Sequence, residues 1–123
     1  MIIYPIIENI FFVLFAVLCN VLAQISLKKA SQVISLDFFN YLTFNALLTN
    51  SFVWLGVFLY GISFILTIKI YARFSLSIIS PIMMGLIFIA ILISSYFVFG
   101  EILTFRKFIG ISIITLGMYI ISK

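Results

Sequence analysis

The sequence contains no histidine and a single cysteine, Cys19. One cysteine cannot form a disulfide within the chain, and without histidine there is no Cys/His set of the kind that binds zinc. A phosphate-binding glycine-rich loop and a paired nucleophile and base are missing as well. We therefore expect no metal, no cofactor and no enzymatic activity.

Charge is also scarce in this chain. Only 8% of the 123 residues are charged and 66% are hydrophobic, whereas roughly a quarter of the residues in an ordinary soluble domain are charged. This composition predicts an integral membrane protein. The 7 basic residues outnumber the 3 acidic ones and lie mainly at the ends of apolar segments. We expect them to face anionic membrane lipid rather than nucleic acid.

The apolar residues fall into four segments, each near the ~20 residues that a helix needs to cross the hydrocarbon core. We expect an all-α fold of four transmembrane helices in one domain that covers residues 1–123. Between the first two spans, the segment 31–51 mixes aromatic and polar side chains. It predicts an interfacial loop with a short amphipathic helix over 37–48, capped by Asp37. The expected spans are 8–28, 52–71, 78–99 and 105–122.

A polar row lies in the first span, where Asn20, Gln24 and Lys28 recur every four residues. On an α-helix this spacing places the three side chains on one face. Polar groups are costly in hydrocarbon, so the row should face other helices or a cavity. Two interpretations of the amides stay open: contact with the sugar or phosphate of a substrate, or hydrogen bonds between helices. Lys28 is either an interfacial anchor or a ligand for a lipid phosphate.

No span carries an acidic residue at its middle. Export of cations in exchange for protons requires a titratable carboxylate on the pathway, so this absence argues against that chemistry. Glu8 lies at the start of the first span, where we expect it at the interface. Glu101 lies at the end of the third span, where we expect a turn residue that pairs with Arg106 or Lys107.

Proline and glycine lie at informative positions in the last two spans. Pro81 is near the start of the third span and Gly85 follows one turn later, which predicts a kink. Gly110 and Gly117 share one face of the fourth span, and small residues so placed let membrane helices approach closely. One four-helix protomer hardly encloses a path for a large headgroup. We therefore expect a homodimer, or a heterodimer with a similar four-helix chain.

Several stretches carry a family resemblance. They are AVLCNVLAQISLKKA in the first span, SIISPIMMGL in the third, VFGEILTFRKFIG at the following turn and ITLG near the end. These stretches resemble the drug/metabolite transporter superfamily, which includes EamA-like proteins. Four spans in this length resemble the small multidrug resistance proteins, which are dimers of four-helix protomers. Within this group the chain is most similar to the aminoarabinose-lipid flippase subunits.

The resemblance implies roles for individual residues. Gly110 and Gly117 match the dimer-packing glycines of the small multidrug resistance proteins. Asn20 stands where their exporters carry a glutamate, and Ser80 and Met83 stand where they carry Tyr and Trp. The flippase subunits also lack the glutamate. Their likeness implies transport of a polyprenyl-phosphate-linked sugar across the bacterial inner membrane. It further implies a substrate-binding site that includes Asn20, Gln24, Lys28, Arg73, Ser80 and Met83, with the phosphate near Lys28 or Arg73.

Three functions follow as hypotheses. The first is a flippase for a lipid-linked sugar or a related small molecule. The second is a small multidrug resistance-type cation exporter without the usual glutamate. The third is a non-transporting membrane subunit of a glycosyltransferase or transporter complex.

Overall fold

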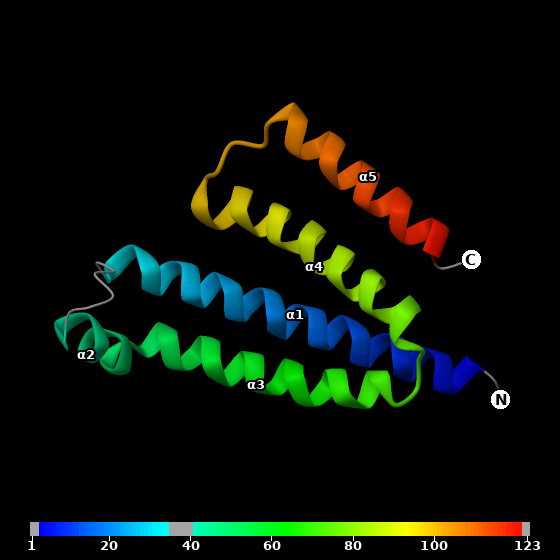
Figure 1. The fold of residues 1–123 in the computed structure, drawn as a ribbon, viewed down its shortest axis with the longest axis horizontal. Coiled ribbons are helices and arrows are strands. Elements are labelled where there is room, and N and C mark those ends of the chain that lie inside the picture. The colour runs from blue at the N-terminus through cyan, green and yellow to red at the C-terminus, as the bar shows by residue number, and fades with distance from the viewer. Residues whose placement is uncertain (1–2, 35–40, 122–123) are drawn as a thin grey trace.

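The computed structural model describes residues 3–34 and 41–121, with side chains from Asn9 onward. The described residues form five α-helices and no strand (Figure 1). The prediction of an all-α chain is confirmed. The helices are α1 (Ile3–Val33), α2 (Tyr41–Thr49), α3 (Ser51–Tyr71), α4 (Leu76–Phe99) and α5 (Phe105–Ile121).

Three of the helices are long and apolar enough to cross a membrane: Asn9–Val33 of α1, and the whole of α3 and α4. α3 and α4 coincide closely with the second and third expected spans, whereas α1 contains the first expected span and extends beyond it at both ends. α5 coincides with the fourth and has 17 residues. At about 1.5 Å of rise per residue it is about 26 Å long, a little shorter than a typical hydrocarbon core.

α1 does not end where the first span is expected to end. Lys28 and Lys29 are helical, and the helix continues through a further turn to Val33. Lysine is a good helix former, and the residues that follow are Ala, Ser, Gln and Val. No Gly or Pro lies among them to interrupt the helical hydrogen bonds. A pair of lysines can therefore interrupt an apolar run without ending the helix.

α2 lies in the segment where a short interfacial helix is expected. The expected start of that helix and its Asp37 cap lie outside the described residues. A side-chain hydrogen bond joins α2 to α3, since Trp54 Nε1 donates to the carbonyl oxygen of Leu48 at 2.7 Å. Asn50, the residue between the two helices, caps α3, because its side-chain Oδ1 accepts from the backbone N–H of Phe52 at 2.9 Å.

α1 and α3 lie side by side and run antiparallel along most of their length (Figure 1). Small residues form the contact face of α1, and Ala16 and Ala23 are completely buried. Gly56 of α3 is buried opposite them, and a Cβ built on it would lie 2.9 Å from Leu27 Cγ and 3.3 Å from the Ala23 carbonyl oxygen. Glycine and alanine thus let the two backbones approach closely.

A buried hydrogen bond crosses the same contact. The hydroxyl of Ser63 on α3 donates to the carbonyl oxygen of Ala16 on α1 at 3.0 Å. The same serine's carbonyl oxygen accepts from the Thr67 hydroxyl at 2.7 Å. In a hydrocarbon environment a serine without a partner is costly, so this bond favours one register between the helices.

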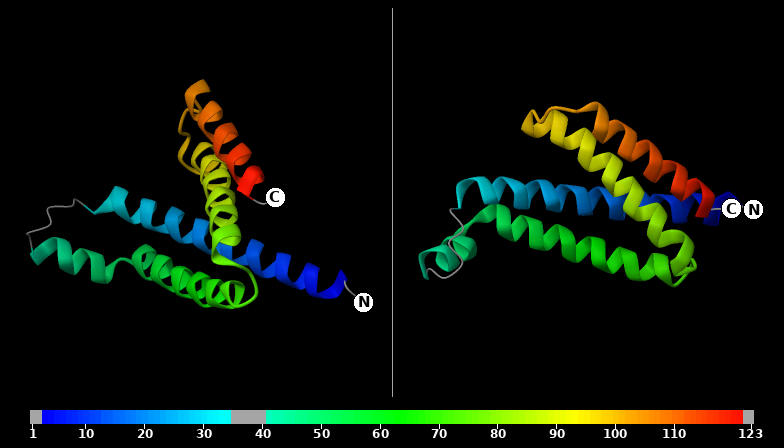
Figure 2. Two further views of the ribbon diagram at one scale, coloured as in Figure 1. Left: turned by 45° about the vertical axis from the view of Figure 1, so that its right-hand side comes forward. Right: turned by 45° about the horizontal axis from the view of Figure 1, so that its top comes forward.

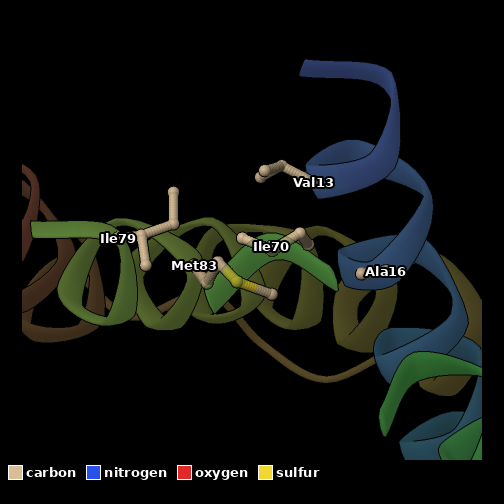
Figure 3. Packing of buried hydrophobic residues seen from close by; sticks show 5 residues of the cluster. All are labelled: Val13, Ala16, Ile70, Ile79 and Met83. Atoms are coloured by element: carbon tan, nitrogen blue, oxygen red, sulfur yellow. The ribbon is translucent and has the colours of Figure 1, made fainter. Parts of the chain in front are cut away.

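α1, α3 and α4 meet in one apolar cluster (Figure 3). α1 contributes two side chains, α3 one and α4 two, and Phe12, Leu66 and Leu86 pack against them. The cluster lies toward the N-terminal part of α1 and the turn between α3 and α4. It fixes the start of α4 on the α1–α3 pair. Its members are Val13, Ala16, Ile70, Ile79 and Met83.

α4 crosses α1 and diverges from it toward the C-terminal end of α4, and α5 lies on the far side of α4 from α1 and α3 (Figures 1 and 2). α4 ends at Gly100, whose φ of 63° is in the left-handed region that favours glycine. α5, all of which the structure describes, has no buried residue. The described part of the chain therefore consists of a tightly packed α1–α3 pair and an α4–α5 hairpin that is attached mainly through α4.

The α1–α3 contact predicts unequal effects for two glycines of α3. Gly56→Leu should lower the free energy of unfolding by about 1–3 kcal/mol, because its side chain has to displace Leu27 and approach the Ala23 carbonyl. Gly61→Leu is the matched control, since no described atom lies within 4 Å of its added Cβ. Unfolding in mixed micelles, followed by circular dichroism, measures both. Equal effects of the two substitutions would contradict close packing at Gly56.

Candidate functional site

A cleft of about 520 Å³ opens between α1, α4 and α5. α4 lies between the other two helices (Figures 1 and 2). Six of the lining residues come from α4, and we call its surface the floor of the cleft and the surfaces of α1 and α5 its walls. We call it the lysine cleft, because Lys28 of α1 and Lys107 of α5 both line it. The other lining residues are Gln24, Ile25, Phe88, Ile91, Leu92, Ser94, Ser95, Phe99, Glu101, Gly110, Ile111 and Ile114.

The lysine cleft lies between a tight helix contact and a turn. A Cβ built on Gly85 of α4 would lie 1.6 Å from the sulfur of Met118, so this methionine of α5 occupies the space that the glycine leaves. Farther along α4, the cleft residues extend from Phe88 to Phe99, and the chain then turns at Gly100. α5 thus packs closely against α4 at Gly85, and the cleft lies farther along α4, toward the turn at Gly100.

The polar row of α1 enters the lysine cleft in part. Gln24 and Lys28 line it, whereas Asn20 is one turn away from it and partly buried. Gln24 Nε2 donates to Asn20 Oδ1 at 2.8 Å. This bond lies within α1, so it does not join α1 to another helix. It lowers the cost of holding two amides in an apolar environment and fixes the orientation of Gln24 beside the cleft.

Two lysines from different helices place positive charge at the end of the lysine cleft that is next to the α4–α5 turn. We call this end the mouth of the cleft. Lys28 extends from α1, and Lys107 comes from the first turn of α5. Lys107 Nζ is 3.9 Å from Glu101 Oε2 and donates to the Ile102 carbonyl oxygen at 3.4 Å. The predicted pairing of Glu101 with a neighbouring cation is confirmed for Lys107. Both side chains are more than 40% exposed, so the pair contributes about 0–1 kcal/mol.

Arg73 lies at the opposite end of the protein from the lysine cleft. Its guanidinium donates to Asn9 Oδ1, near the start of α1. Asn9 and Lys28 are separated along α1 by about 28 Å, at 1.5 Å of rise per residue. One headgroup cannot contact Lys28 and Arg73 together in this conformation. Arg73 instead lines a smaller cavity of about 230 Å³ with Lys69, whose ammonium lies 5.6 Å from the Phe12 ring centre.

Ser80 and Met83 lie away from the lysine cleft, toward the end of the protein that carries Arg73. Met83 is buried in the cluster with Ala16 and Ile79, and Ser80 is partly buried beside it in sequence. Among the residues that the structure describes, neither of the two lines the lysine cleft. The six predicted substrate-binding residues therefore do not form one site here. Gln24 and Lys28 share the cleft, Met83 belongs to the core and Arg73 lies at the far end.

The predicted kink and packing residues have distinct surroundings. α4 is assigned as continuous helix through Pro81, and the kink stays a prediction. Gly85 accommodates Met118, which is a close approach within the protomer. A Cβ added to Gly110 or Gly117 would have no described atom within 4 Å, and Gly110 lines the lysine cleft. Neither of these two glycines packs tightly within the protomer, so their role toward a second chain stays a prediction.

The residues that sequence reasoning missed come from the turn before α5, from the first turn of α5 and from the second half of α4. Lys107 and Glu101 line the lysine cleft, and Phe88 and Ser95 form part of its floor. Topology carried a signal for the first two: in a four-span chain the end of the first span and the turn between the third and fourth lie on the same side. No such signal singles out Phe88 or Ser95.

Protein-family models, curated proteins and solved structures were compared with this chain, and none matches it. Within the described part of the chain, no three His, Cys, Asp or Glu residues lie close enough to hold a metal ion. The geometry of the lysine cleft is thus the main observation that bears on function.

The Gly85–Met118 contact predicts a coupled pair of substitutions. Gly85→Ala should reduce the free energy of unfolding by about 1–3 kcal/mol, since Met118 must leave its position. Combined with Met118→Ala, the same substitution should cost less, with a coupling energy of about 0.5–3 kcal/mol. Gly117→Ala is the control because its Cβ meets open space. Additive effects in thermal or denaturant unfolding would show that the two residues do not share this site.

Proposed function

We propose that this protein is a multi-pass membrane transporter that moves a polyprenyl-phosphate-linked sugar, or a related anionic amphiphile, across the bacterial inner membrane. One observation carries the proposal. The lysine cleft combines apolar walls with an amide and two ammonium groups at one end. This distribution complements a ligand that has a hydrocarbon tail, a phosphate and a sugar.

The chemistry of each part of the cleft supports that ligand class. Phe88, Ile91 and Ile114 offer an apolar surface for an isoprenoid chain. Gln24, whose Nε2 already donates to Asn20, can use its Oε1 to accept a bond from a sugar hydroxyl. Lys28 can bind a phosphate as a point charge from the headgroup side.

The same proposal gives α5 the role of a fourth transmembrane helix. Its length of about 26 Å, from 17 residues at 1.5 Å each, approaches the thickness of the hydrocarbon core. All its large apolar side chains except the partly buried Ile111 and Met118 are exposed in the protomer, which suits a lipid environment or a second chain. We propose a homodimer, or a heterodimer with a similar four-helix chain, in which the face of Gly110 and Gly117 meets the partner.

A second candidate is a cation exporter of the small multidrug resistance type. One observation favours it. Glu101 lines the lysine cleft, and its carboxylate is a group that could hold a cation. Its ion pair with Lys107 partly neutralises it, so it would have to release that lysine to hold a cation. Binding of a lipophilic cation that depends on Glu101 would support this alternative.

The proposal predicts that transport depends on the cleft lysine of α1. Lys28→Gln should slow the movement of a fluorescent polyprenyl-phosphate sugar in proteoliposomes by about tenfold or more, the effect of losing a charge-assisted hydrogen bond. Gln24→Ala should also slow it. Lys29→Gln is the matched control, because Lys29 lies 6.0 Å from the Phe52 ring centre and does not line the cleft among the described residues.

The same preparations separate the alternatives. Native mass spectrometry of the wild-type protein should show a bound anionic polyprenyl lipid and an even number of protomers. Unchanged transport in Lys28→Gln and Gln24→Ala, with the variants folded, would remove the cleft from the pathway. Transport that appears only after addition of a partner chain would favour the subunit hypothesis.

A further inference from the structure

The two lysines of the cleft belong to opposite walls. Lys28 is on α1, which packs tightly against α3. Lys107 is in the first turn of α5, beside the turn of the α4–α5 hairpin. Both are exposed, and both line the same cleft. A single anion that contacts both lysines would therefore connect two structural units that are otherwise connected mainly through α4.

We propose that Lys28 and Lys107 bind one phosphate group between them and that this phosphate draws α5 toward α1, closing the lysine cleft around the ligand. The inference rests on the proposed function and adds Lys107 as a ligand, Glu101 as its exchangeable counter-ion and closure as the consequence.

Electrostatics makes the closure dependent on the ligand. Without an anion, an approach of α5 to α1 brings two ammonium groups together, and like charges repel. With a phosphate between them, both interactions become attractive. Since the lysine side chains are long and flexible, they can follow the phosphate as the mouth narrows.

Glu101 can give up Lys107 easily. Their 3.9 Å separation is longer than a charge-assisted hydrogen bond, which is about 2.7–2.9 Å, and both side chains are largely exposed. A phosphate offers more oxygens at shorter distance than this loose pair. Before ligand binds, Glu101 therefore keeps the Lys107 ammonium near the mouth. When the phosphate arrives, it replaces the Glu101 carboxylate as the partner of Lys107.

The surroundings of α5 permit the movement. α5 has no buried residue along its described length, so little packing is lost when it shifts. Gly110, one turn after Lys107, faces the cleft and has no described atom within 4 Å of an added Cβ. The backbone of α5 can approach α1 at this position without a side chain in the way. The Met118–Gly85 contact remains as the pivot, because methionine is unbranched and adaptable.

Binding tests the bridge first. The full chain in nanodiscs is titrated with a polyprenyl phosphate, with the uncharged polyprenol and with inorganic phosphate. Lys107→Gln should weaken binding of the polyprenyl phosphate by about tenfold or more, and Lys107→Arg should restore most of it. Arg106→Gln, which removes the neighbouring charge outside the cleft lining, should leave binding unchanged. The double variant Lys28→Gln/Lys107→Gln should be less affected than the product of the single effects, because both lysines act on one group.

Closure is measured by the distance between two spin labels near the mouth, attached at Val33→Cys and Phe108→Cys. Both native side chains are exposed, and Cys19→Ser removes the native thiol. Polyprenyl phosphate should shorten the distance in the labelled protein, and Lys107→Gln should abolish the change. The same shortening with inorganic phosphate would support the bridge and identify free phosphate as a sufficient ligand.

Three results would overturn the inference. They are equal effects of Lys107→Gln and Arg106→Gln on binding, additive effects of the two cleft lysines, and the same closure with polyprenol. In each of these cases binding of the polyprenyl phosphate that depends on Lys28 would leave the proposed function standing. Failure of the wild-type protein to bind or move any polyprenyl phosphate would instead reject the proposed function as well.

Discussion

The close contact between α1 and α3 is the constraint on which the rest of the structure depends. Alanine at 16 and 23 and glycine at 56 bring two backbones together, and the Ser63 hydroxyl bonds to a carbonyl across the contact. In a membrane, where apolar side chains gain little by leaving lipid, such packing and hydrogen bonding are the main sources of specificity. The pair then presents a fixed surface on which α4 lies, and α4 in turn carries α5.

Much of this fold is visible in the sequence because long apolar segments leave few choices of secondary structure. Apolar segments of about 20 residues have to be helices, since their backbone groups find no partner in hydrocarbon. The positions of α3 and α4 follow from this rule. The end of α1 does not, because Lys28 marks the change from apolar to polar surroundings while the backbone pattern continues to Val33. Hydropathy shows where an apolar segment of the sequence ends, whereas helix propensity determines where the helix ends.

The candidate site was less predictable, because it depends on how the helices cross. Periodicity correctly placed Gln24 and Lys28 on one face of α1, and both line the lysine cleft. It could not show that α4 crosses α1 so that Met83 enters the core, nor that Arg73 lies at the far end. The partner of Asn20 also depended on the side-chain rotamer. Its amide bonds within the helix, which a spacing of four permits and does not require.

The hydrogen bond from Trp54 to the Leu48 carbonyl has a consequence for depth in the bilayer. An indole favours the level of the lipid headgroups, and this one is tied both to the first turn of α3 and to the last turn of α2. If α3 crosses a bilayer, a shift of α3 along the membrane normal would therefore also raise or lower α2.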